Sequence, residues 1–359
     1  MSKMIVNELV AELNLPDALP MTKDKDGKEV PSGLPPYARV KAHVVDEYPA
    51  CPSSWMNGSD ISSSYFVPVK AGKGMWLDFN GCHNHNHEVA VVISVQGVNP
   101  INGQKQNVMR LEQYKTNCPI HDKTFKQDRF CEDCGFKWPA QNYLATTGTP
   151  HGQFWIDGFR SENGQVRQYI FTEEEAKGVA SQLIGDDKVY AIGIAFYLSK
   201  EKKKVKSEST TSSAMGKPLS SFHDLFEDMW GKKGPASSTL HTNSITRNSI
   251  AETPTSKGIF RGSNSDVEGT IEMPEMTVCT DTNTEEIVVD KKLEVGLGSS
   301  INQEVNKDTE SLDFWQDKPA GFIYINYCTQ DQCEKILAAG KRKEKKGGFT
   351  NGLLSVINE

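Results

Sequence analysis

The sequence predicts a mainly β protein, an antiparallel and jelly-roll-like β-sandwich that carries a few short helices and two insertions. The first observation is a series of short segments rich in β-branched and aromatic residues, which Gly, Pro, Asn or Asp separates. The second is a stretch with the Cys and His spacing of a metal-binding ribbon or knuckle. The third is a long Ser- and Thr-rich tract in a 359-residue chain whose hydrophobic content is only 37%, which is typical of a partly disordered chain.

Residues 1–16 are predicted to form an N-terminal amphipathic helix. Ile5, Leu9 and Leu13 recur at helical spacing, and a proline ends the helix. This helix could dock on the body of the protein or on a partner. Residues 17–36 are polar and rich in Lys, Asp, Gly and Pro, so we expect a loop that acts as a tether.

Residues 37–200 are expected to form the core of the sandwich. The segments that predict strands are YARVKAHVVD, SYFVPVKAG, GMWLDF, HEVAVVISVQG, GQFWIDGF, GQVRQYIF and VYAIGIAFYL. An Asn-Gly pair within FRSENGQVRQ is a turn signal and predicts a hairpin there. A short helix is predicted from Thr172, an N-cap residue, to Gly185.

Residues 201–285 are predicted to be a disordered Ser/Thr-rich linker, because hydrophobic periodicity disappears there. Within it, residues 221–230 (SFHDLFEDMW) place their large apolar side chains near one face of a short helix. This short helix could bind in the groove of a partner or fold back onto its own domain.

Residues 286–340 contain strand-like segments followed by a helical one. They are EEIVVD, LEVGLGSSINQEV, AGFIYINYC and CTQDQCEKILAAGKRK. Short strands and one helix cannot bury a core alone, so we expect them to complete the sandwich formed by the first part of the chain. Residues 341–359 are rich in Lys and Gly and are predicted to be a flexible basic tail.

The insertion at residues 115–143 carries the clearest chemical signal. Cys118 and His121 are followed, after nine intervening residues, by Cys131 and Cys134, which gives C-x2-H and then C-x2-C. Zinc favours four tetrahedral nitrogen and sulfur ligands, and structural sites pair two close ligands with two more across a loop. The pattern predicts a structural zinc site, because four protein ligands leave no open position. The alternative is a set of free surface thiols and an unrelated histidine.

A second candidate metal site is formed by His83, His85 and His87, which alternate and would share one face of a strand. Three imidazoles can form an open zinc, copper or iron site, to which Glu88 or Asp78 would add a carboxylate. Residues two apart on a strand are about 7 Å from each other, which is long for ligands of one ion unless the chain bends. The alternative is a polar strand end whose histidines face solvent.

Two blocks of sequence carry a family resemblance. QFWIDGFRSENGQVRQYIF contains a W-[LI]-D-G motif and then V-R-Q-[FY], matched by Trp155, Asp157, Gly158, Val166, Arg167 and Gln168. LEVGLGSSINQEVNKDTESLDFWQDKPAGFIYINY supplies a later pattern, matched by Gly296, Gly298, Gln303, Asp308 and Trp315. Together the blocks resemble the signature of a large uncharacterised family of bacteria, fungi and protists, and they cover about a fifth of the chain. The resemblance implies no known activity, and the Cys/His insertion and the long linker depart from its pattern.

The residues of these blocks suit a structural role. Trp155 can anchor a core, and Asp157 can accept backbone hydrogen bonds in a turn. Arg167 can form a bidentate pair with Asp157 or Asp308. The functional alternative is an Arg-centred site for an anion or a peptide.

Composition restricts the class of function. The net charge of −7 gives no global attraction to nucleic acid or to an anionic membrane. No apolar run reaches the roughly 18 residues that a membrane span needs. The N-terminus lacks the features of a secretory signal, so we expect a cytoplasmic protein with reduced thiols. The sequence has no phosphate-binding loop, no G-x-S-x-G and no H-E-x-x-H.

The functional hypothesis is a non-enzymatic, zinc-stapled β-sandwich protein that binds other proteins or builds an assembly. One alternative is a metal-dependent enzyme that uses His83, His85 and His87. Another is nucleic-acid binding through the basic residues of the zinc segment, although acidic residues lie among them. These basic residues are Lys123, Lys126, Arg129 and Lys137.

Overall fold

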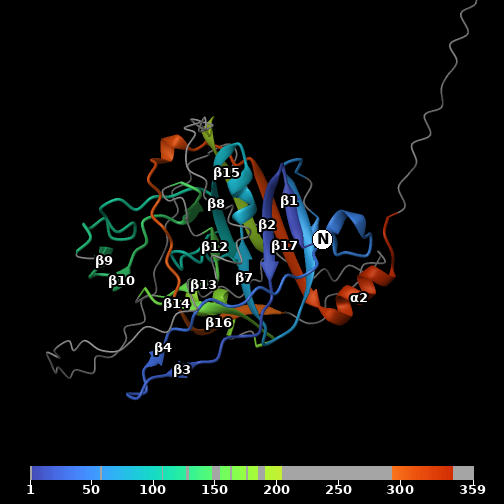
Figure 1. Ribbon diagram of the computed structural model, residues 1–359, viewed down its shortest axis with the longest axis horizontal. Coiled ribbons are helices and arrows are strands. Elements are labelled where there is room, and N and C mark those ends of the chain that lie inside the picture. Colours follow the sequence, from blue (N-terminus) through green and yellow to red (C-terminus); the bar gives the residue numbers. More distant parts are fainter. Residues whose placement is uncertain are drawn as a thin grey trace, which may run out of the picture. The chain divides into compact units, whose positions relative to one another are not determined.

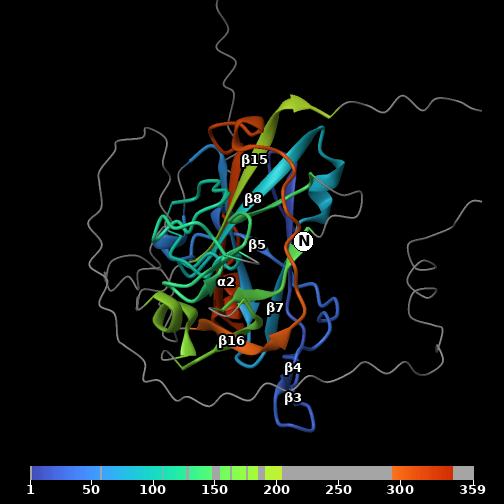
Figure 2. The same cartoon turned by 90° about the vertical axis from the view of Figure 1, so that its left-hand side faces the viewer.

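The computed structural model describes residues 2–342 except 57–58, 107, 127–128, 148–153, 162–163, 175–176, 185–190 and 204–292. Two large β-sheets lie face to face within these ranges and enclose one large hydrophobic core (Figures 1 and 2). The prediction of a mainly β sandwich with a few short helices is confirmed.

The first large sheet has seven strands in the described residues. They pair in the order β1-β2-β7-β14-β13, with β12 beside β7 and β16 beside β14. All these pairs are antiparallel. The strands are β1 (Lys3–Val6), β2 (Leu9–Asn14), β7 (Gly74–Asp78), β12 (Trp155–Ile156), β13 (Gly158–Arg160), β14 (Val166–Thr172) and β16 (Glu294–Ile301).

The second large sheet has six strands in the same ranges, in the order β11-β8-β15-β17-β6-β5. One pair differs from the expected antiparallel pattern, because β17 runs parallel to β6 along its whole length. These two strands are far apart in sequence, so no hairpin imposes an antiparallel pairing on them. The strands are β5 (His43–Val44), β6 (Ser62–Val69), β8 (His87–Val95), β11 (Tyr143–Ala145), β15 (Ile192–Lys202) and β17 (Gly321–Thr329).

The core between the sheets follows from strand alternation. Leu77 of β7 and Phe171 of β14 meet Val91 of β8, Ile194 of β15 and Ile323 of β17 in one buried cluster. Burying a side chain of this kind contributes about 1.5–3 kcal/mol each. The residues after position 286 take part directly, since β16 lies in the first sheet and β17 in the second.

The predicted N-terminal helix is wrong, because residues 3–14 form the hairpin β1–β2. Asn7 and Glu8 have φ angles of 47° and 66°, as the turn of a tight two-residue hairpin requires. Leu9 and Leu13 share a face of β2, because positions four apart lie on one face of a strand as well as of a helix. Leu9 and Leu13 are buried in the sandwich core, whereas Ile5 is 42% exposed.

Residues 17–36 are not a free tether. They contain the small hairpin β3 (Thr22–Lys23) with β4 (Glu29–Val30). The Leu19 N–H donates to Gln168 Oε1 at 2.9 Å, and the Ser32 N–H donates to the Ser300 carbonyl at 2.9 Å. The segment therefore packs against β14 and β16. A second small hairpin, β9 (Phe130–Cys131) with β10 (Phe136–Lys137), lies in the Cys/His insertion.

The helices are short. The α-helix α2 (Gln330–Ala338) begins at Thr329, whose side chain accepts the Gln332 N–H in a capping box. Thr172, the expected start of another helix, is the last residue of β14, and helical structure appears only at η6. The other short helices within the described residues are η1 (Val45–Glu47), η2 (Ser53–Trp55), η3 (Asn80–Asn84), the π-helical η6 (Ala180–Ile184) and η7 (Leu312–Phe314).

Several predicted segments lie outside the described residues. These are the linker beyond residue 203, its helix at 221–230, and the basic tail beyond residue 342. In the part of the chain that the structure describes, no helix is long and apolar enough to cross a membrane.

Candidate metal centre

Two tight turns present the four predicted ligands. In the first, the Asp122 N–H donates to the Cys118 carbonyl at 2.8 Å, and Asp122 has a φ of 50°. In the second, the turn from Cys131 to Cys134 lies between β9 and β10 and is followed by Gly135, whose φ is 64°. Glycine adopts this left-handed conformation at little cost. Figure 1 shows β9 and β10 beside the sheets.

The four side chains converge on one point. The Sγ atoms of Cys118 and Cys134 are 3.9 Å apart. His121 Nδ1 lies 3.7 Å from Cys118 Sγ and 3.6 Å from Cys131 Sγ. Tetrahedral zinc with ordinary bond lengths places two sulfurs about 3.8 Å apart and a sulfur and a nitrogen about 3.5 Å apart. The cluster of Cys118, His121, Cys131 and Cys134 could therefore hold a metal ion.

A small apolar cluster lies against the ligands. Phe136 and Trp138 are buried and pack edge to face, with ring centroids 5.1 Å apart. Tyr114 packs on Trp138 in the same way. This cover shields the thiols, since Cys118 is fully buried while His121 is exposed.

Arg129 holds the insertion together, a role that the sequence did not indicate. Its guanidinium donates to the carbonyls of Trp138 and Pro139 at 3.1 Å, and also to those of Lys115 and Tyr114. Burial lowers the pKa of this group. No local pattern marks an arginine that bonds only backbone carbonyls, so sequence reasoning read it as a surface charge.

The thiols of the second turn have opposite pKa shifts. Burial opposes ionisation of Cys131, but hydrogen bonds from the backbone N–H groups of Cys134 and Asp133 and contacts with the neighbouring thiols lower its pKa to about 6. Burial raises the pKa of Cys134 to about 11. A stabilised thiolate with further sulfur atoms beside it favours the binding of a metal cation, because the thiolate is the form of cysteine that binds metal.

The basic residues around the cluster are largely engaged within the insertion. Lys123 pairs with Asp133 at 2.6 Å, and Lys126 pairs with Glu132. Together with the backbone contacts of Arg129, these pairs neutralise the face that a phosphate backbone would need. The structure therefore gives no support to nucleic-acid binding at this segment.

The three alternating histidines are not gathered around one point. His83 lies in η3, His85 follows that helix and His87 begins β8, so the expected single strand face does not exist. The His87 ring bonds the Ser199 carbonyl through Nδ1 at 2.8 Å, and the His83 ring packs on Phe154. Within the described ranges, the Cys3His cluster is the one group whose ligand atoms lie close enough for a metal ion.

Two predicted pairings of the family motif are wrong. Arg167 pairs with Glu29 at 2.8 Å, not with Asp157 or Asp308. Asp157 is 1% exposed, and neither carboxyl oxygen has a hydrogen-bond partner in the described residues. Gln168 is buried on β14, where it pairs with Gly158, the residue after Asp157.

Asp308 is the centre of a buried hydrogen-bond network. Its carboxylate accepts from the Tyr143 hydroxyl at 2.6 Å, from Trp315 Nε1 at 3.0 Å and from the Thr147 hydroxyl. The Glu310 N–H also donates to it, at 3.0 Å. A carboxylate with this many donors is satisfied and structural.

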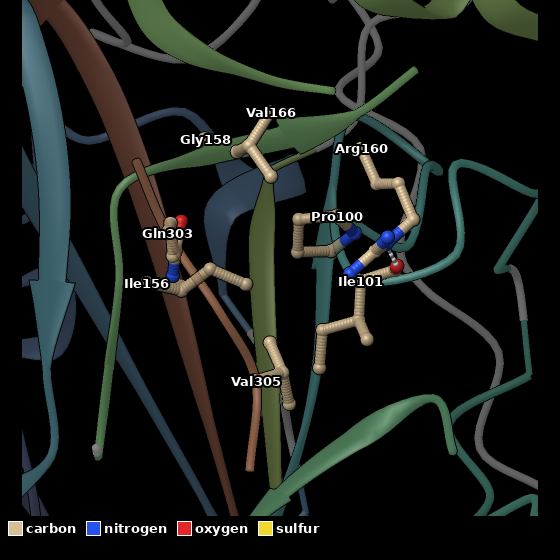
Figure 3. A pocket seen from close by; sticks show the side chains of 8 residues that line it. All are labelled: Pro100, Ile101, Ile156, Gly158, Arg160, Val166, Gln303 and Val305. Carbon is tan, nitrogen blue, oxygen red and sulfur yellow. Dashed lines mark hydrogen bonds between the residues drawn. The ribbon is translucent and has the colours of Figure 1, made fainter. Parts of the chain in front are cut away.

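The motif also borders a small pocket that Figure 3 shows. Gly158 lines it, and a Cβ there would lie 2.0 Å from the Arg167 carbonyl oxygen, which explains the glycine. Arg160 Nε donates to the Ile101 carbonyl at 3.0 Å, so the guanidinium is committed to backbone. The rest of the lining is mostly apolar and offers no reacting group. It consists of Pro100, Ile101, Ile156, Val166, Gln303 and Val305.

No protein-family model, no curated protein and no solved structure matches the chain. The function must therefore be inferred from the site.

Proposed function

We propose that this is a non-enzymatic, zinc-stapled β-sandwich protein that acts by binding other proteins or by building an assembly. One observation carries the proposal: the ligand atoms of three cysteines and one histidine all lie within 4.8 Å of one another. Three of the distances between them, 3.6, 3.7 and 3.9 Å, are close to those of a tetrahedral zinc site. Four protein ligands leave no position for water or substrate, so the ion would stabilise the insertion and not catalyse.

The surface around the cluster supports a role in protein binding. Ile120 lies between two of the ligands and is 52% exposed, and Phe130 precedes a third and is 38% exposed. A staple that fixes a short loop also fixes the apolar side chains at its tip. Preorganised apolar contacts of this kind lower the cost of association. The proposal further places the chain in a reducing compartment such as the cytoplasm, since its described cysteines are free thiols.

Metal content per chain, measured by elemental analysis, tests the staple. The wild type is compared with a Cys131→Ser/Cys134→Ser variant and with a His83→Ala/His85→Ala/His87→Ala variant. We expect one zinc per chain in the wild type and in the histidine variant. The cysteine variant should lose the zinc and melt at a lower temperature, because zinc binding contributes folding free energy.

Two results would overturn the proposal. One is a wild type that takes up no metal even after reconstitution with zinc. The other is a metal ion lost only in the histidine variant, which would favour the metal-dependent enzyme. For protein binding, sedimentation and cross-linking provide the readout, and a chain that stays monomeric and cross-links to nothing contradicts that part.

A further inference from the structure

The first sheet turns one face to the sandwich core and the other face outward. Leu13 and Leu77 pair across β2 and β7 and are buried in the core. Because side chains alternate along a strand, their neighbours Glu12, Trp76 and Asp78 lie on the outer face. Glu12 and Asp78 are direct partners in the ladder, so two carboxylates stand side by side there.

An aromatic corner stands beside these carboxylates. The rings of Tyr37 and Trp76 meet edge to face, with centroids 4.7 Å apart and an angle of 68°. Trp76 Nε1 donates to the Pro36 carbonyl at 3.2 Å, which holds this segment against the sheet. Trp76 is buried and Tyr37 is 66% exposed, so the corner opens to solvent.

A third carboxylate, Asp157, lies near the same corner. Trp155 pairs with Asp78 across β12 and β7, and Asp157 follows just beyond the end of β12. Burial raises the pKa of the Tyr37 hydroxyl, and the charges of Asp78, Glu12 and Asp157 raise it further. The negative charges of all three carboxylates therefore reach the Tyr37 hydroxyl.

Asp157 is the group that points to a missing ligand. It is 1% exposed, and neither of its carboxyl oxygens has a partner in the described part of the chain. Burial is the one resolved cause that raises the pKa of Asp157 to about 7, so no cation compensates it. A buried carboxylate without a donor is costly, and a bound cation would remove that cost.

The chain itself shows what kind of cation fits. The guanidinium of Arg39 lies 5.8 Å from the centroid of the Tyr37 ring, and its Nε is 2.7 Å from Glu12 Oε2. The Arg39 side chain remains 56% exposed, so it lies at the outer edge of this group of side chains and does not fill the space between them. Asp78 Oδ1 accepts hydrogen bonds from the Asn80 N–H and side-chain amide, both at 2.8 Å, but these donors are neutral. One guanidinium beside three carboxylates therefore leaves negative charge uncompensated.

We propose that the acidic cup formed by Glu12, Tyr37, Trp76, Asp78 and Asp157 binds the guanidinium group of an arginine side chain from a partner protein. Guanidinium stacks on aromatic rings and bonds carboxylates in a fork, which is the combination that this cup offers. A metal ion fits less well, because these carboxylates are not among the groups whose oxygens lie close enough to share one ion. The inference rests on the proposed role in protein binding, but it concerns a surface without zinc ligands.

The test is a titration of the full-length, zinc-loaded protein with the peptide acetyl-Gly-Arg-Gly-amide, followed by saturation-transfer-difference NMR. We expect signal transfer to the arginine side-chain protons, and none with the citrulline peptide, which has the same shape without charge. Tyr37→Ala should weaken binding about tenfold or more, because a cation–π contact and a wall are lost. Arg39→Ala should strengthen it by up to about fivefold, because a competing surface ion pair is removed.

The controls separate binding from folding. Tyr37 is largely exposed, so its replacement should lower the melting temperature only slightly, through the lost contact with Trp76. Met21→Ala, at 55% exposure, is the matched control. Zinc is measured in every sample, so a failure here is distinguishable from a failure of the staple. The proposal is overturned if neither the wild type nor Arg39→Ala binds the arginine peptide. It is also overturned if the citrulline peptide binds as well, or if Tyr37→Ala binds unchanged.

Discussion

Replacing Asp157 by Asn should change how stability depends on pH. Burial raises the pKa of Asp157 from 3.8 to about 7, so the folded protein holds this proton more tightly than the unfolded chain does. The stability gained from the protonated acid is complete below about pH 4 and is lost as the pH rises through about 7. The difference of about three pH units, at about 1.4 kcal/mol per unit, amounts to about 4 kcal/mol.

The assay is urea unfolding of the wild type and of Asp157→Asn at intervals from pH 5 to pH 8. This range spans about two of the three pH units, so the stability of the variant relative to the wild type should increase by about 3 kcal/mol across it. Asp26→Asn, in the exposed turn between β3 and β4, is the control and should show no such trend. A difference between Asp157→Asn and the wild type that stays constant, or that falls with rising pH, would refute the reasoning.

Two further substitutions test the framework around the sites. Gly158→Ala should destabilise the protein by about 3 kcal/mol or more, because the new Cβ would lie 2.0 Å from the Arg167 carbonyl oxygen. Gly33→Ala, where nothing lies within 4 Å, should leave the unfolding midpoint nearly unchanged, and equal midpoints for the two variants would contradict the steric argument. Thr329→Ala should cost about 1 kcal/mol in urea unfolding, because α2 loses its capping box, and an unaltered midpoint would show that the cap does not contribute.

The candidate metal centre was predictable because its information is local. Cys118 with His121 and Cys131 with Cys134 are close pairs, and a turn of fixed size brings each pair together. The strands of the sandwich were predictable for a similar reason, since alternation and turn residues are visible within ten residues. The N-terminal hairpin was missed because the same apolar spacing suits a helix and a strand, and the turn at Asn7 and Glu8 carries no glycine.

Long-range register was not predictable from the sequence. The partner of Arg167 is Glu29, from a segment that composition marked as a loose tether. The parallel pairing of β17 with β6 joins residues that are far apart in the sequence. Such contacts depend on how sheets assemble, and no single window of sequence contains that information.

The two motif blocks can be far apart in sequence because the strands on both sides of the intervening segment are fixed in the two sheets. β15 ends at Lys202 and β16 begins at Glu294, and each strand is fixed in a sheet. Gln303 then bonds the N–H of Asp157 at 3.1 Å, and Asp308 bonds Tyr143, so the second block packs on the first. Each doubling of a connecting segment costs only about 0.6 kcal/mol in closure entropy. The length of chain between β15 and β16 can therefore vary with little effect on the stability of the sandwich.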